Sequence, residues 1–148
     1  MLSAKLVRVV EEHEDQIATG VLAQIRGDPE MSHFRTLPEA ELREWGREIL
    51  HNLGHWLGGG HEQEIARRYD ELGRLRFLED VPLRESIRGL CILKQKMLDF
   101  VEDHQINRTV VEVYAEEEMG RRIGRFFDLL ICHLVGGYER ALRHAAHA

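Results

Sequence analysis

Three histidines in one short segment have the spacing of a zinc-protease motif. His51, His55 and His61, together with Gly58, match the H-E-x-x-H-x-x-G-x-x-H signature of metzincin proteases. That signature puts two imidazoles on one helix face and brings the third to the same zinc ion after a turn. Asn52, however, stands where the glutamate must act as general base, and an amide cannot take a proton from bound water. The spacing therefore leaves a non-catalytic metal site as a hypothesis and argues against a protease.

Other catalytic motifs are missing from the sequence. The chain has no glycine-rich phosphate loop, no C-x-x-C pair and no G-x-S-x-G nucleophile motif. The two cysteines, Cys91 and Cys132, lie within apolar helical patterns, and we expect both to be buried, reduced thiols. We therefore expect no enzymatic activity.

The composition is that of a globular protein without a preference for polyanions. The chain has 148 residues, of which 43% are hydrophobic and 31% charged, which suits a single domain over residues 1–148 with one core. Its formal net charge of -6 gives no reason to expect binding to nucleic acid or to anionic lipid. No apolar stretch approaches the roughly 20 residues of a membrane span. The N-terminus also lacks the pattern of a signal peptide, so we expect a cytoplasmic protein.

The apolar residues recur with helical periodicity, and no segment alternates like a strand. This pattern predicts an all-α fold of about five helices, near residues 3–26, 38–57, 62–78, 83–103 and 109–143 or beyond. The glycines 58–60 should end the second helix in a sharp turn, and a polar turn is expected at residues 105–108. A metzincin has a β-sheet ahead of its zinc helix, so this expected fold also argues against a protease.

The last expected helix is apolar on an unusually large part of its circumference. One stripe consists of Ile123, Phe127, Leu130, Leu134, Tyr138 and Ala141, and a second lies beside it with Phe126, Ile131, Val135 and Leu142. Burial of one Leu or Phe side chain is worth roughly 1.5–3 kcal/mol, so a second stripe left in water would forgo much stability. We therefore expect a homodimer with this helix in the interface. The alternative is that the first and fourth helices cover both stripes within one chain.

Short segments of the chain resemble the N-terminal domain of RsbR-type proteins, the family named for the RsbT co-antagonist RsbRD. They are residues 72–77 (LGRLRF) with 81–85 (VPLRE), and residues 126–128 (FFD) leading to 137–139 (GYE). The tryptophan-bearing helix at residues 45–57 fits the same pattern. The resemblance thus covers about residues 38–143.

This resemblance implies a globin-like helical bundle that acts as a dimeric sensor in bacterial signal transduction. Such domains usually precede an output module, either a phosphorylatable STAS domain or a histidine kinase, and the family offers no defined catalytic residues. We therefore expect a sensing or regulatory domain whose partner is an output domain or protein of this kind. Because the sequence ends at Ala148, we expect either an excised sensor or a free-standing partner protein.

A globin-like fold raises haem as an alternative ligand. If the expected helices correspond to globin helices A, B, E, G and H, the proximal histidine belongs between the third and the fourth. No histidine occurs between His61 and His104, so an ordinary globin haem lacks its ligand. A bound haem would then need an irregular site. The first candidates for its ligand are His104 and His133, and the less favoured ones are His51 and His55. We expect no cofactor; a haem- or metal-binding sensor remains the alternative function.

Overall fold

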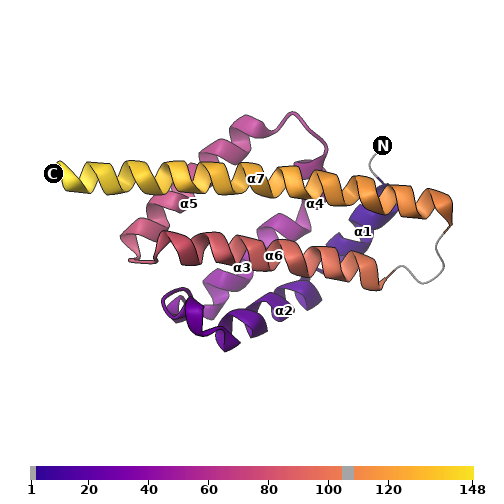
Figure 1. Ribbon diagram of the computed structural model, residues 1–148, viewed down its shortest axis with the longest axis horizontal. Coiled ribbons are helices and arrows are strands. Elements are labelled where there is room, and N and C mark those ends of the chain that lie inside the picture. Colours follow the sequence, from indigo (N-terminus) through magenta and orange to yellow (C-terminus); the bar gives the residue numbers. More distant parts are fainter. Residues whose placement is uncertain (1–2, 105–108) are drawn as a thin grey trace.

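The computed structural model describes residues 3–104 and 109–148. Over these two segments the chain forms seven α-helices and two short 3-10 turns, without any strand (Figure 1). The all-α fold predicted from the sequence is confirmed, whereas the polar turn expected at residues 105–108 lies outside the described residues. Within the same segments, no helix has both the length and the apolar character needed to cross a bilayer. The helices are α1 (Ala4–Glu12), α2 (Glu14–Gly27), α3 (Glu39–His51), α4 (Leu53–Leu57), α5 (Glu62–Leu78), α6 (Leu83–Asp103) and α7 (Val110–Ala146), and the 3-10 turns are η1 (Pro29–Met31) and η2 (Phe34–Thr36).

Two of the expected helices are interrupted, so the prediction of about five helices was too low. The first breaks at His13, whose backbone leaves the helical region and whose Nδ1 donates a hydrogen bond to the Val9 carbonyl at 2.7 Å. The second breaks at Asn52, with φ -116° and ψ 34°. Apolar residues keep their helical spacing through both breaks, which is why periodicity alone did not indicate them. The predicted glycine turn is confirmed, since Gly59 and Gly60 both have positive φ, at 85° and 79°.

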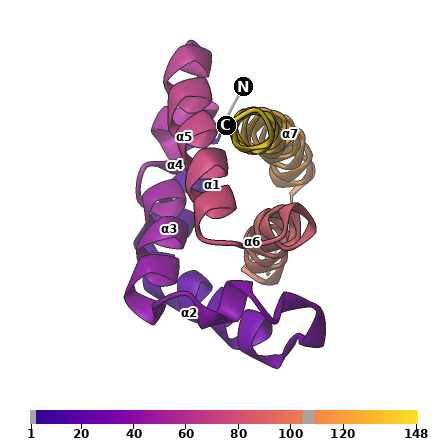
Figure 2. The ribbon, with the colours of Figure 1, turned by 90° about the vertical axis from the view of Figure 1, so that its left-hand side faces the viewer.

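The longest helix, α7, runs along the whole molecule, and its C-terminal end projects beyond the other helices (Figure 1). Seen from that end, α6 lies between α7 and α2, and α5 stands beside α7 (Figure 2). The core between the helices is formed by side chains such as Leu93, Met97, Met119 and Ile123, each of them almost fully buried. Helix α7 is therefore both a wall of the core and the element that extends furthest from it.

Two buried charges fix the helices around the core. Glu85 is 3% exposed and accepts hydrogen bonds from the backbone nitrogens of His33 and Phe34, at 2.9 and 3.2 Å. Arg76 is 2% exposed, and its Nη1 donates to Glu41 at 3.1 Å and to Glu79 at 2.9 Å. Because buried polar groups are costly unless they are paired, these bonds specify how α6 meets η2 and how α5 meets α3.

The expectation of two buried cysteines was wrong, because Cys91 and Cys132 are both exposed free thiols. Each follows a buried or half-buried apolar residue in the chain, yet it lies on the outer side of its helix. Position within an apolar run does not determine which side of a helix faces solvent, since successive residues are about 100° apart.

The second apolar stripe of α7 is only partly open. Phe126 is buried within the chain, where it stacks on Trp56 with ring centroids 6.3 Å apart. Ile131 and Val135 are half-buried, and Leu142 is 51% exposed. The open part of this stripe therefore lies toward the C-terminal end of α7, further along than Ile131 and Val135. At the other end of the helix, apolar side chains outside the stripe are also exposed, among them Val110, Val111 and Tyr114.

Candidate functional site

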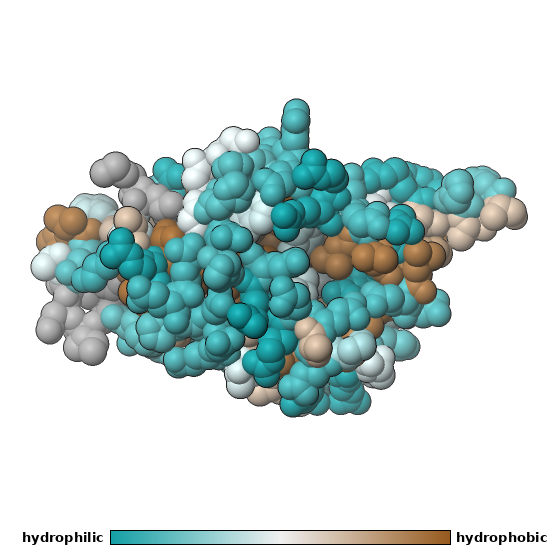
Figure 3. All heavy atoms as spheres, turned by 180° about the vertical axis from the view of Figure 1, so that it is seen from behind, coloured by the Kyte–Doolittle hydropathy of each residue, from teal (hydrophilic) through white to brown (hydrophobic). Residues whose placement is uncertain are grey.

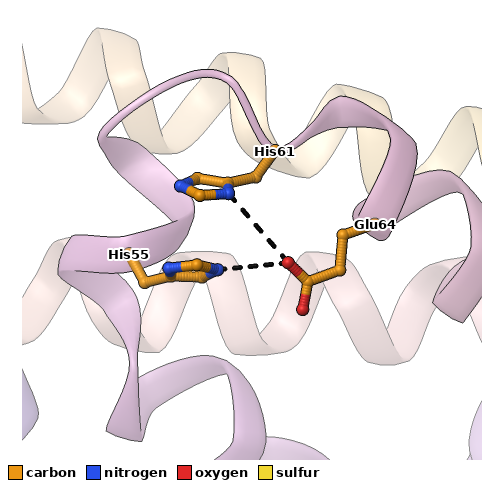
Figure 4. Close-up of side chains that lie close together, drawn as sticks. All are labelled: His55, His61 and Glu64. Carbon is orange, nitrogen blue, oxygen red and sulfur yellow. Dashed lines mark hydrogen bonds and ion pairs between the residues drawn. The ribbon is translucent and has the colours of Figure 1, made fainter.

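The structure brings two of the three motif histidines together and separates the third. The rings of His55 and His61 are in contact, with centroids 3.8 Å apart and planes tilted by 34° (Figure 4). His51 lies elsewhere, with its Nδ1 2.9 Å from the Glu14 carboxylate. The helix break at Asn52 falls between His51 and His55, so the expectation that these two share one helix face was wrong.

Glu64, in the first turn of α5, completes the group. Its Oε2 lies 3.2 Å from Nε2 of His55 and 4.0 Å from Nδ1 of His61 (Figure 4). The bond from His55 is the largest of the effects that lower the pKa of the Glu64 carboxyl, which favours the ionised form. The sequence interpretation missed Glu64. An acidic residue three positions after His61, at the start of the next helix, was the signal that could have found it.

The surroundings hold these three side chains in place. His55 packs edge-on against Trp56, at 4.9 Å between ring centroids, and Trp56 is anchored in the core. Arg68, one turn along α5, contacts the other oxygen of Glu64 at 3.4 Å and lies over the Trp56 ring. The side chains of His55, His61 and Glu64 are 44%, 32% and 30% exposed. The cluster is thus ordered by its neighbours and open to solvent.

The two foremost haem candidates lie on different elements. His104 caps the end of α6, stacked on Phe100 at 3.9 Å, and its Nδ1 donates to the Phe100 carbonyl at 3.0 Å. Its ring is also 5.5 Å from that of His13. His133 is half-buried in the middle of α7. The contacts of His104 are those of a helix-terminal side chain packed against an aromatic ring.

A cavity of about 690 Å³ opens between α5 and α7 near the projecting end of α7. An ion pair joins its two walls, with Arg140 of α7 contacting Asp70 of α5 at 2.6 Å. Leu78, which lines it, is 59% exposed, and Leu75 and Leu142 are exposed on the same two helices. Seen from behind, apolar atoms form a patch beside this end of the molecule (Figure 3). The remaining walls include Glu71, Arg74, Phe77, Gly137 and Ala141.

Two glycines bring α5 and α7 into backbone contact at this cavity. A Cβ at Gly137 would lie 2.0 Å from the Asp70 carbonyl oxygen, and one at Gly73 would lie 2.2 Å from that of Leu134. Only glycine fits such an approach. Tyr138 adds a hydrogen bond to the Val81 carbonyl at 2.9 Å and so ties α7 to the connection between α5 and α6.

Comparison with known protein families gives a match to the model described as the RsbT co-antagonist protein rsbRD N-terminal domain, over residues 15–148. The chain belongs to this family. No curated protein and no solved structure matches it. The match spans α2 to α7, whereas α1 precedes it.

The resemblance seen in the sequence has a structural basis in this RsbRD N-terminal domain. The segment with Gly73 and the segment with Gly137 are far apart in the chain, and they meet at the backbone contact of α5 and α7. Val81, in the quoted segment 81–85, accepts the hydrogen bond from the Tyr138 hydroxyl. The all-α bundle is also consistent with the globin-like fold that the resemblance implied. Three of the quoted segments, 72–77, 81–85 and 137–139, therefore meet in one contact region between α5, α7 and the residues just before α6.

Proposed function

We propose that this RsbRD N-terminal domain is a regulatory module without catalysis of its own, which acts as a homodimer in bacterial signalling. It passes a change in its helical bundle along α7 to an output module, such as a STAS domain or a histidine kinase. The family match and the form of α7 support this. With 37 residues, that helix is about 55 Å long at the usual rise per residue.

The observation that carries the proposal is the uncovered surface beside the projecting end of α7. Here the cavity, Leu78 and Leu142 give apolar area to a partner, since exposed leucines gain stability on burial. The same surface carries both signs of charge, as in the pair Arg140–Asp70. A surface with apolar centre and mixed charges suits a second copy of itself, because a twofold interface brings the same patch together from both chains.

The contact between α5 and α7 supports the relay. Because the two backbones touch at Gly73 and Gly137, no side chain lies between them that could shift and absorb a movement of one helix. A displacement of α5 is therefore passed to α7 as a movement of a whole helix, as in other switches built from packed helices. In the dimer, both copies of α7 respond together.

Sedimentation equilibrium at micromolar concentration tests the dimer. We expect a mass twice the monomer's 17.2 kDa, and we expect Leu78→Glu or Leu142→Glu to reduce it to the monomer while circular dichroism stays helical. Val111→Glu is the matched control, because Val111 is 76% exposed at the opposite end of the same helix. A monomer mass at all concentrations, or a dimer split only by Val111→Glu, would refute the proposed interface.

A further inference from the structure

We propose that His55, His61 and Glu64 bind one divalent transition-metal ion of the zinc class at the turn between α4 and α5. This inference goes beyond the proposed regulatory function and does not depend on the dimer. Each residue offers one ligand atom, and the three atoms lie within 4.8 Å of one another. The side chains come from both sides of the glycine turn, and both imidazoles face the same carboxylate oxygen of Glu64 (Figure 4).

The distances suit a tetrahedral ion. Zinc bonds of roughly 2.0–2.2 Å to imidazole and carboxylate place neighbouring ligand atoms about 3.4 Å apart. The observed separations from Glu64 Oε2 are 3.2 Å to His55 and 4.0 Å to His61. A small rotation of the His61 ring, which is 32% exposed, brings the second distance into range. Because the three side chains are partly exposed, water would fill the fourth position.

The short distance between the two imidazoles argues against a pair of charged rings. Two protonated histidines with centroids 3.8 Å apart would repel each other. Neutral rings avoid that repulsion, and they would ligate one cation once each ring turns so that its in-plane nitrogen lone pair points at the ion. Glu64 does not bond equally to both rings, because its Oε2 lies within hydrogen-bond distance of His55 and further from His61.

Arg68 orients the carboxylate. It contacts Oε1 of Glu64 at 3.4 Å, which leaves Oε2 toward the imidazoles. A second layer of residues that fixes the direction of the ligands is typical of metal sites. Two imidazoles and one carboxylate favour zinc, cobalt, nickel or copper over magnesium and calcium, whose ligands are oxygen atoms. Bound there, the ion would link α4 to α5 across the turn at Gly59 and Gly60. We expect no hydrolytic activity from it, because Asn52 cannot act as a general base.

Titration of tag-free protein, first stripped with EDTA, tests the site. We expect Co²⁺ to give the visible absorption of a tetrahedral complex at one equivalent per chain, and Zn²⁺ to displace it. His61→Ala and Glu64→Gln should each weaken binding by about tenfold or more, the scale of effect known for residues that support a metal. His51→Ala is the control, because His51 pairs with Glu14 outside the cluster.

Each result decides the matter. Binding unchanged by His61→Ala, or weak binding of several ions that no single variant affects, would overturn the site. Loss on His51→Ala equal to that on His61→Ala would overturn it too, and would favour the ligand set of the sequence motif. The replaced side chains of His61 and Glu64 are partly exposed and that of His51 is exposed, so circular dichroism should confirm that every variant folds.

Discussion

Gly137 of α7 lies directly against the backbone carbonyl of Asp70 in α5, so closely that a Cβ there would stand 2.0 Å from the oxygen. Gly73 of α5 makes the reciprocal approach to α7. The closest contact between the two helices is therefore made by backbone atoms. Family motifs distant in sequence converge on this contact, which also borders the cavity at the projecting end of α7.

Replacing Gly137 by alanine should destabilise the domain. The added methyl group meets rigid backbone, so α5 and α7 must separate, at a cost of about 1–3 kcal/mol or more. Gly124→Ala is the matched control on the same helix, since nothing lies within 4 Å of a Cβ there. It should raise stability by about 0.5–1 kcal/mol, the ordinary preference for alanine in a helix. Urea unfolding followed by circular dichroism measures both, and a Gly137→Ala domain as stable as the wild type would contradict the close contact.

Asp28 should contribute to stability at neutral pH and lose that contribution in acid. The Arg88 guanidinium, 2.7 Å away, and the Glu30 backbone nitrogen hold the pKa of this carboxyl below its usual value of 3.8. A group whose pKa is lower in the folded state stabilises the fold above its unfolded pKa, and this stabilisation disappears as the pH falls through the folded value.

The variant Asp28→Asn tests that dependence, because asparagine keeps the capping oxygen and removes the charge. Its melting temperature should be lower than that of the wild type at pH 7, and the two should converge below pH 3.8. Glu62→Gln, which replaces an exposed side chain at the start of α5, is the control, and its melting temperature should stay close to that of the wild type. If the difference in melting temperature between Asp28→Asn and the wild type stays constant from pH 7 to strong acid, the charge of Asp28 plays no part in stability.

The sequence predicted the later helices better than the earlier ones. Helices α5 and α6 begin and end where expected, because glycines 58–60 precede α5, Pro82 separates the two helices, and a run of polar residues follows α6. The breaks at His13 and Asn52 have no such marker, and the apolar spacing continues across them. The motif histidines were recognised by chain spacing, yet the break at Asn52 redirects His51. Glu64 joins the cluster only because the turn at Gly59 and Gly60 folds α5 back toward His55.

Haem should not copurify with this domain. His104 is packed on Phe100 and bonded to its carbonyl, so its ring is already held at the end of α6. The prediction is checked by an absorption spectrum of protein expressed with an adequate haem supply. A stoichiometric Soret band that His104→Ala or His133→Ala removes would refute it.

The most direct test of a dimer joined beside the end of α7 is a distance between its two copies. Cys132 is exposed on α7 and lies about 15 Å along that helix from Leu142. A spin label at Cys132, in a Cys91→Ser background, can therefore be measured by pulsed electron paramagnetic resonance. We predict one defined distance below about 50 Å, because about 15 Å of helix rise and about 10 Å of helix width lie on each side of the interface. This distance should disappear in Leu142→Glu and persist in Val111→Glu. No dipolar coupling at micromolar concentration, or a distance that Leu142→Glu leaves unchanged, would contradict the account.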